Sequence, residues 1–180
     1  FQGVGTNLLF VTPGSFEGAG PPSSLRDRPG ELTNSDVAAL RDPLRAPDVA
    51  AVAPQVYRST AVTTLRRDTI ADVNGITPEY ARVRNWYPAV GTFVDEQHLT
   101  SRARVAVIGQ TVAETLFPDN PFPLEETIKI NGVPFRIIGI LEEKGGSQFG
   151  DQDNVVLVPI TMAQTRLFPS RSRSGEYQVS

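Results

Sequence analysis

Three β-rich stretches decide the fold of this chain: Val105-Ala-Val-Ile-Gly109, Thr127-Ile-Lys-Ile-Asn-Gly-Val-Pro-Phe-Arg-Ile-Ile-Gly139 and Val155-Val-Leu-Val-Pro-Ile160. They are rich in β-branched residues and are bounded by Gly, Pro or Asn, a pattern typical of strands. The middle stretch contains Asn131-Gly132, the strongest short-range signal for a β-hairpin. None of the three carries a nucleophile, a general base or a metal ligand. The sequence therefore predicts a β-rich core and points away from catalysis.

Four further segments have strand composition, and two have loop composition. The expected strands are Thr6–Thr12, a region within Val49–Leu65, Thr69–Gly75, and a strand that begins in Glu176–Ser180. The loops are the Gly, Pro and Ser-rich stretch Gly14–Gly30, which we expect to be mobile, and the Gly-rich stretch Lys144–Gly150.

Helical patterns alternate with these strands. Thr33 and Asp36 are N-cap candidates ahead of apolar Val37, Leu40 and Leu44, and Pro43 limits the helix. The other expected helices run from Pro78 to Val83, with Thr77 as N-cap, from Gln110 to Phe117, and from Met162 to Phe168, with Thr161 as N-cap. The alternation predicts an α+β fold.

The composition is that of an ordinary globular protein, with 39% hydrophobic and 21% charged residues in a chain of 180. This length allows one domain or two small lobes. A net charge of −3 with both signs interspersed offers no basic stripe for phosphates, which argues against nucleic acid as a partner. The absence of cysteine excludes disulfides, thiolate metal sites and a cysteine nucleophile. Because the chain begins at Phe1, we expect it to be a segment of a longer protein.

Two acidic clusters could suggest chemistry. His98 is the only histidine and stands beside Asp95 and Glu96, but three ligands within four residues cannot converge on one ion in a regular element. Asp151-Gln-Asp153-Asn154 resembles the start of a calcium loop without its central Gly and terminal Glu. We interpret the first cluster as solvated or turn residues and the second as a turn. No catalytic, cofactor-binding or metal residue is predicted.

Aromatic residues suggest both packing and contact. Trp86, with Tyr80 and Tyr87, is interpreted as packing within a lobe, since aromatic side chains bury large areas. In the two loops, Phe16, Gln148 and Phe149 are the candidate partner-contact residues, because partner surfaces tend to lie on loops.

An ordered set of motifs resembles the MacB-like periplasmic core domain of FtsX/MacB-family ABC transporter permeases. The motifs are Gly5-Thr-Asn-Leu-Leu-Phe-Val-Thr-Pro-Gly14, Pro88-Ala-Val-Gly91-Thr-Phe, Arg104-Val-Ala-Val-Ile-Gly109, Ala113-Glu-Thr-Leu-Phe117, Ile128-Lys-Ile-Asn-Gly-Val-Pro-Phe-Arg-Ile-Ile-Gly-Ile-Leu141 and Asp153-Asn-Val-Val-Leu-Val-Pro159. They span nearly the whole chain. One departure is Pro123-Leu-Glu-Glu126, where the family pattern has Gly and a basic residue in place of the two Glu, so the geometry of this turn is left open.

The resemblance implies a porter-like β-α-β lobe, residues 1–65 and 172–180, with a second mixed α/β lobe, residues 66–171, inserted into it. It also implies an extracytoplasmic domain of a cell-membrane ABC transporter, non-catalytic itself, that couples cytoplasmic ATP hydrolysis to export or extraction of a substrate. Its implied partners are the ATP-binding subunit or domain, a second permease copy in a dimer, and a periplasmic adaptor or envelope protein.

Two other functions stay open. A regulatory interaction module would bind and control an envelope enzyme such as a peptidoglycan hydrolase, and a free-standing secreted domain would bind a ligand. Flanking hydrophobic spans in the parent protein would argue against the free-standing domain. None of these residues selects the transported substrate.

Overall fold

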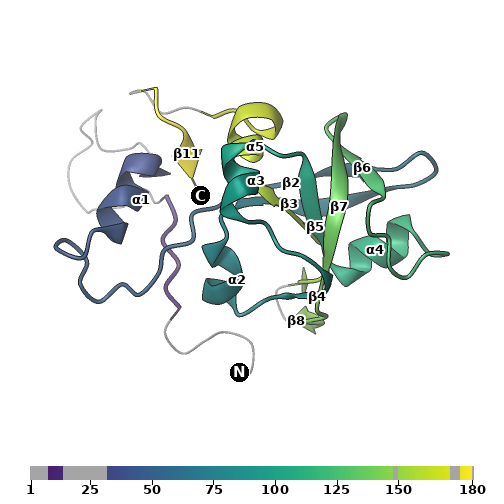
Figure 1. Ribbon diagram of the computed structural model, residues 1–180, viewed down its shortest axis with the longest axis horizontal. Helices are drawn as coiled ribbons and strands as arrows, with labels where there is room; N and C mark the ends of the chain where they lie inside the picture. The colour runs from purple at the N-terminus through teal and green to yellow at the C-terminus, as the bar shows by residue number, and fades with distance from the viewer. Residues whose placement is uncertain (1–7, 14–31, 148–149, 171–174, 180) are drawn as a thin grey trace, which may run out of the picture.

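The computed structural model describes residues 8–13, 32–147, 150–170 and 175–179 (Figure 1). The strands are β1 (Leu32–Thr33), β2 (Val56–Thr63), β3 (Asp68–Ile76), β4 (Pro88–Gly91), β5 (Val105–Ile108), β6 (Thr127–Ile130), β7 (Val133–Leu141), β8 (Gly146–Ser147), β9 (Gly150–Asp151), β10 (Val155–Pro159) and β11 (Gln178–Val179). The helices are α1 (Asn34–Arg41), α2 (Glu79–Arg84), α3 (Glu96–Thr100), α4 (Gln110–Leu116), α5 (Ile160–Met162) and the π-helix η1 (Ala163–Leu167). This mixture confirms the predicted α+β class.

A seven-stranded sheet closes on itself and forms the core of the fold. Its strand order is β4-β7-β5-β10-β3-β2-β6, and β6 pairs in addition with β7. One edge of β7 pairs with β5, while its other edge pairs with β6 along the first half and with β4 at the end. We call this closed sheet the barrel. Closure leaves two unpaired edges in this sheet, the outer edge of the short strand β4 and the first part of β2, of which only Val62 and Thr63 pair with β6.

The β6–β7 hairpin confirms the strongest local prediction. Its turn residues Asn131 and Gly132 have φ angles of 49° and 78°. Two successive positive φ values define a type I′ turn, whose twist matches that of the flanking strands. The expected turn chemistry therefore sets the register Ile130↔Val133.

The strands at the centre of the barrel sheet are buried on both faces. In β5, Ala106 and Ile108 belong to one apolar cluster, whereas Val105 and Val107 belong to a second one. The second cluster contains Tyr80 and Trp86, which are 4% and 2% exposed. This double burial explains the continuous apolar runs of β5 and β10. It also confirms that Trp86 packs within the fold, although Tyr87 is 45% exposed.

Several predicted boundaries were wrong. Residues 8–13 form no strand, and Leu9 is 82% exposed, although Thr6–Thr12 has strand composition. By contrast, the strand expected within Val49–Leu65 is present as β2. Leu44 lies outside α1 and is 94% exposed, because the helix ends at Arg41 ahead of Pro43. Burial, which composition does not report, decides each of these cases.

The last helix begins earlier than predicted. It starts at Ile160, directly after Pro159, and widens into the π-helix η1. Thr161 is therefore inside the helix and does not cap it. Its hydroxyl donates instead to the carbonyl of Leu99, which joins α5 to α3.

The turn that departs from the family pattern carries backbone strain. Glu125 stands where that pattern has Gly, and its φ angle is 65°. This left-handed conformation is unfavourable for a residue with a Cβ atom. Glu125 is held there by its N–H, which donates to the Ile137 carbonyl, and by an ion pair of 2.7 Å with Arg136.

The helix α1 and the two-stranded sheet β1–β11 lie beside one end of the barrel (Figure 1). The division into lobes of residues 1–65 with 172–180 and of 66–171 stays a prediction. The antiparallel pairing of β2 with β3, from Val56↔Gly75 to Thr63↔Asp68, does place β2 in the barrel sheet.

Candidate functional site

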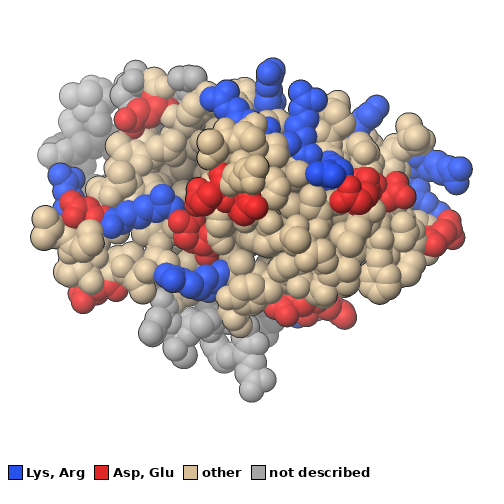
Figure 2. Space-filling model, in the orientation of Figure 1, with Lys and Arg blue, Asp and Glu red and all other residues tan. Residues whose placement is uncertain are grey.

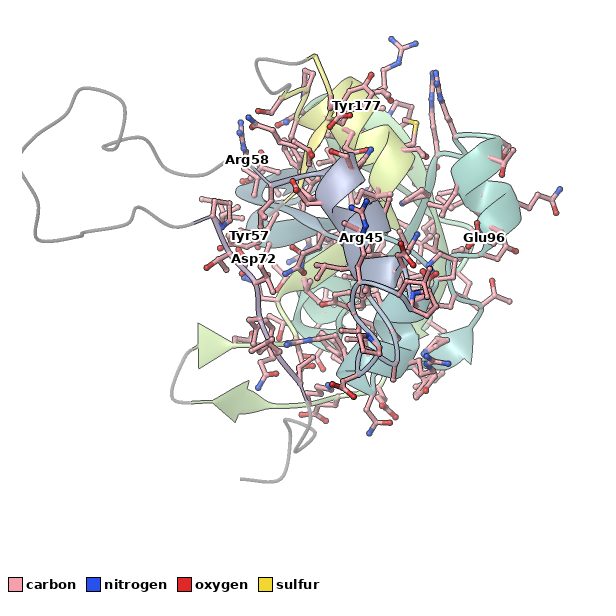
Figure 3. All side chains as sticks on the ribbon, turned by 90° about the vertical axis from the view of Figure 1, so that its left-hand side faces the viewer. Arg45, Tyr57, Arg58, Asp72, Glu96 and Tyr177 are labelled. Atoms are coloured by element: carbon pink, nitrogen blue, oxygen red, sulfur yellow. The ribbon has the colours of Figure 1, made fainter. Side chains whose placement is uncertain are left out.

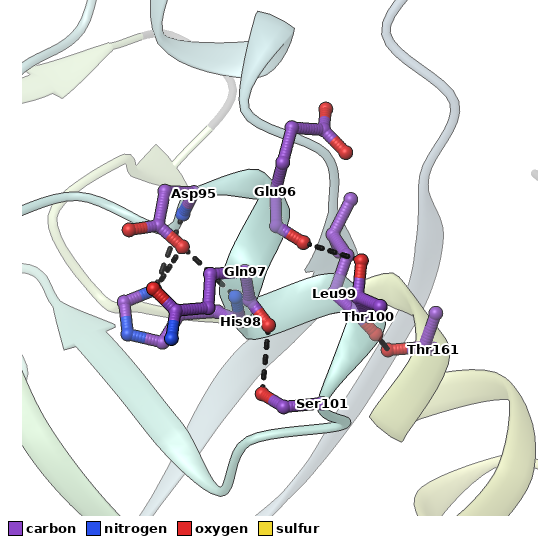
Figure 4. Close-up of polar contacts among 8 residues, drawn as sticks. All are labelled: Asp95, Glu96, Gln97, His98, Leu99, Thr100, Ser101 and Thr161. Carbon is purple, nitrogen blue, oxygen red and sulfur yellow. Dashed lines mark hydrogen bonds and ion pairs between the residues drawn. The ribbon is translucent and has the colours of Figure 1, made fainter.

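The cluster around His98 is a helix cap (Figure 4). The Asp95 carboxylate accepts a bond of 2.8 Å from the His98 backbone N–H, and His98 Nδ1 accepts from the Asp95 N–H at 3.2 Å. These reciprocal bonds form a capping box at the start of α3. Glu96 takes no part, since only its carbonyl is used, by Thr100. No group of three or more potential metal ligands is assembled in the parts of the chain that the structure describes.

Asp153, from the calcium-like motif, holds the base of the Gly-rich loop. Its side chain is buried, and its carboxylate accepts from the backbone N–H groups of Lys144 and Gly145 at 2.9 and 2.6 Å. A carboxylate that accepts hydrogen bonds from backbone N–H groups has a structural role, like that of a helix N-cap residue. The motif was therefore correctly interpreted as part of a turn, and Asp153 is its critical residue.

The same loop is fastened to the aromatic cluster through Lys144. Its ammonium lies 4.8 Å from the centre of the Trp86 ring and donates to the Arg84 carbonyl at 2.9 Å. Burial lowers the pKa of Lys144, and the neighbouring Arg84 guanidinium lowers it further. Trp86 Nε1 donates to the Glu142 carbonyl at 2.8 Å. The base of the loop is thus fixed on the barrel.

The candidate partner-contact residues Phe16, Gln148 and Phe149 lie outside the described residues. Their contact role stays a prediction.

The junction between α1 and the barrel is the candidate functional site. Figure 3 faces this side of the molecule, with α1 in front of the barrel. Val37 is the only buried side chain of α1, so little apolar area holds the helix in place. Polar contacts supply much of the attachment of α1 to the barrel. Arg41 donates to Glu79 Oε1 at 3.3 Å and to the Val52 carbonyl at 3.4 Å.

A buried amide completes the junction. Gln164, in η1, is 5% exposed, and its Nε2 donates to Asn34 Oδ1 at 3.3 Å and to the Gln178 carbonyl at 3.2 Å. One side chain of the barrel side therefore contacts both the first residue of α1 and strand β11. Sequence reasoning missed this bridge, since 130 residues separate Gln164 from Asn34 and no local pattern indicates the contact.

The electrostatics of the junction favour an ionised Glu79. Burial disfavours the carboxylate, but the Thr77 hydroxyl, the backbone N–H of Glu79 and the guanidinium groups of Arg41 and Arg82 outweigh it, so the pKa of Glu79 is lowered. Thr77 Oγ1 and Glu79 Oε2 are nevertheless both buried without a hydrogen bond of good geometry. Some buried hydrogen-bonding groups of the junction are therefore not satisfied. A contact surface that moves tolerates such groups better than a core does.

A hollow of about 450 Å³ lies in this junction. Its apolar wall includes Val37, Pro54 and Ile160, and its polar groups include Arg41, Thr77 and Gln164. Residues of α1 and of the barrel side thus line the hollow together.

The surface carries both signs of charge. On the face shown in Figure 2, Lys and Arg project mainly along one edge, and Asp and Glu are interspersed across the rest. In the ranges that the structure describes, no helix is both long and apolar enough to cross a membrane.

The fold is similar to that of extracytoplasmic domains of transporter permeases. The chain is similar to the extracellular domain of the noncanonic ABC-type transporter YknZ from Gram-positive bacteria, with 25% identity and a TM-score of 0.68 over 88% of this chain and 79% of that one. It also has the fold of the periplasmic region of MacB from Actinobacillus actinomycetemcomitans, with 21% identity and a TM-score of 0.66 over 86% of this chain and 67% of that one.

Residues 1–179 match the family model of the MacB-like periplasmic core domain, and the chain belongs to this family. It is 40% identical over 178 residues to the macrolide export ATP-binding/permease protein MacB of Rhodospirillum rubrum, covering 97% of this chain and 26% of that protein. The MacB protein of Rhodopirellula baltica is 33% identical, over 98% of this chain and 25% of its own length. The chain therefore spans about a quarter of these relatives. The family predicted from the ordered motifs is confirmed.

Proposed function

We propose that this domain transmits movement between membrane helices and the outer surface in a permease that exports or extracts a substrate, and that it is not itself catalytic. The observation that carries the proposal is the contrast between the closed barrel and the weakly attached helix α1. The barrel is a closed sheet, whereas α1 is held by one buried side chain and by exposed or incompletely satisfied polar groups. Such a contact can change without unfolding either part.

The relatives support the coupling to ATP. They are named as ATP-binding/permease proteins for macrolide export, and this chain corresponds to about a quarter of their length. We propose an ATP-binding subunit or domain and a second permease copy as partners, with an adaptor or envelope protein on the extracytoplasmic side. The regulatory function would need the same movement. The movement would then control an envelope enzyme in place of exporting a substrate.

The experiment measures the movement directly in the full transporter, with its other cysteines removed. Spin labels are placed through Ala38→Cys on α1 and Glu114→Cys on α4, two exposed positions on opposite sides of the junction. Double electron–electron resonance compares the nucleotide-free state with the state trapped by ATP and vanadate. We expect the distance distribution to shift between the two states.

The matched control pair lies within the barrel. Glu114→Cys and Lys129→Cys are both exposed positions on α4 and β6 and should keep one distance in both states. An α1–barrel distance that is as constant as the control distance would contradict the proposal. Movement without any ATP-driven transport would favour the regulatory function.

A further inference from the structure

The hollow between α1 and the barrel has the size of a ligand site. Its volume of about 450 Å³ falls within the ~300 to 1,000 Å³ range of small-molecule pockets. Its walls come from both parts of the molecule: Val37 from α1, Pro54 from the segment ahead of β2, and Ile160 from α5. A ligand held here would contact both sides of the junction at once.

The charged groups at the hollow already have partners within the chain. Arg41 pairs with Glu79 at 3.3 Å, and Asp42 lies 3.6 Å from Arg45 and accepts from the Leu44 N–H at 2.9 Å. A charged ligand would have to break one of these contacts or leave its own charge uncompensated. The hollow therefore favours a neutral ligand.

One buried hydroxyl at the hollow, that of Thr77, has only a poorly aligned neighbour, the Glu79 carboxylate. Thr77 is 7% exposed, lines the hollow, and has no hydrogen bond of good geometry at Oγ1. Buried hydroxyls without partners are unfavourable, so a ligand group that bonds Thr77 gains more there than at a satisfied site. Gln164, which also lines the hollow, is held by two bonds within the chain and so keeps the polar end of the site fixed.

We propose that the hollow binds a small neutral amphiphile, a mostly apolar molecule with one carbonyl or hydroxyl group that bonds Thr77. The apolar part would lie against Val37, Pro54 and Ile160. Binding is a property of this chain and does not depend on coupling to ATP hydrolysis, so its failure and the failure of the proposed movement are separate results.

The test titrates the 180-residue chain with Nile red, a neutral and largely apolar dye with a carbonyl acceptor, and follows its fluorescence. We expect saturable binding with a blue-shifted emission. Ala38→Trp fills the hollow from α1 and should weaken binding by about 10-fold or more, because a filled pocket loses most of its buried ligand area. Thr77→Val keeps the shape, removes the hydroxyl and should weaken binding about 5- to 10-fold, the effect of one hydrogen bond.

Glu114→Trp, on the exposed surface of α4, is the control and should leave the affinity unchanged. Circular dichroism confirms that each variant is folded, and the isosteric Thr77→Val variant gives a decisive result if Ala38→Trp does not fold. The absence of saturable binding to the unmodified chain would overturn the proposal. So would an unchanged affinity in a folded Ala38→Trp variant or in Thr77→Val.

Discussion

The barrel and the α1 junction are built from the same chain but depend on different interactions. The barrel closes its strands into a ring and buries large side chains such as Phe135 and Leu157 completely. The junction buries one side chain of α1 and relies on Arg41, Glu79 and Gln164. Close packing makes the first rigid, whereas exposed ion pairs contribute little energy to the second. The proposed movement of α1 against the barrel rests on this difference.

The largest effect is expected from Phe135→Ala in the barrel. Phe135 is 0% exposed, so its truncation leaves a cavity and should lower the free energy of unfolding by about 3 to 5 kcal/mol. Urea unfolding monitored by circular dichroism measures the change. Phe122→Ala is the control, since Phe122 is 60% exposed and its truncation should stay within about 0.5 kcal/mol. Similar losses for the two variants would mean that the barrel is not the stability core.

Asp153→Ala extends the test to the loop that is fixed on the barrel. Its loss leaves the N–H groups of Lys144 and Gly145 without their acceptor and should cost about 2 to 3 kcal/mol, as expected for bonds to a buried charged group. Thermal or urea unfolding measures the loss. Asp119→Ala, an exposed position, should be neutral. A neutral Asp153→Ala would show that the loop base is not part of the rigid unit.

Glu125→Gly tests whether the barrel tolerates stored strain. The substitution relieves the positive φ of 65° but removes the exposed ion pair with Arg136. Relief of a left-handed conformation gains about 1 to 2 kcal/mol, and an exposed pair contributes less than about 1 kcal/mol. We expect Glu125→Gly to be more stable than the unmodified chain in urea unfolding, by about 1 kcal/mol. A clear destabilisation would mean that the ion pair contributes more to stability than relief of the left-handed backbone conformation does.

How far the sequence predicts this structure depends on how local each signal is. The Asn131-Gly132 turn, α4 and the strands β5 and β10 follow from neighbouring residues, and all are confirmed. Closure of the sheet is not predictable in this way, because it needs β2 to pair with β6 and β5 to pair with β7, and these strands are far apart in the sequence.

The candidate site was missed for the same reason. Neither Arg41 nor Gln164 belongs to a motif, and their partners Glu79 and Asn34 are 38 and 130 residues away. Thr6–Thr12 shows the opposite error, since strand composition alone does not supply a neighbouring strand. A local pattern predicts elements, and tertiary partners decide which of them form.

The smallest effect is expected from acid at the junction. The pKa of Glu79 lies below its ordinary value of 4.5, so its contribution is complete above that pH and is lost as the pH falls through the folded-state pKa. Because the side chain is 36% exposed, the loss should be less than about 1 kcal/mol. Hydrogen exchange of α1 should accelerate below about pH 4.5 relative to the barrel, after correction for intrinsic rates. In Glu79→Gln this extra acceleration should be absent; if it persists, another group is responsible.

Native-state hydrogen exchange at neutral pH tests the central contrast most directly. It compares the amides of α1 with those of β5 and β10 in one sample of the unmodified chain. We expect α1 to open locally, with a free energy several kcal/mol below that of the barrel strands, which should exchange only through global unfolding. Equal opening free energies in α1 and the barrel would show that they form one cooperative unit, and the junction could not then be the movable part of the domain.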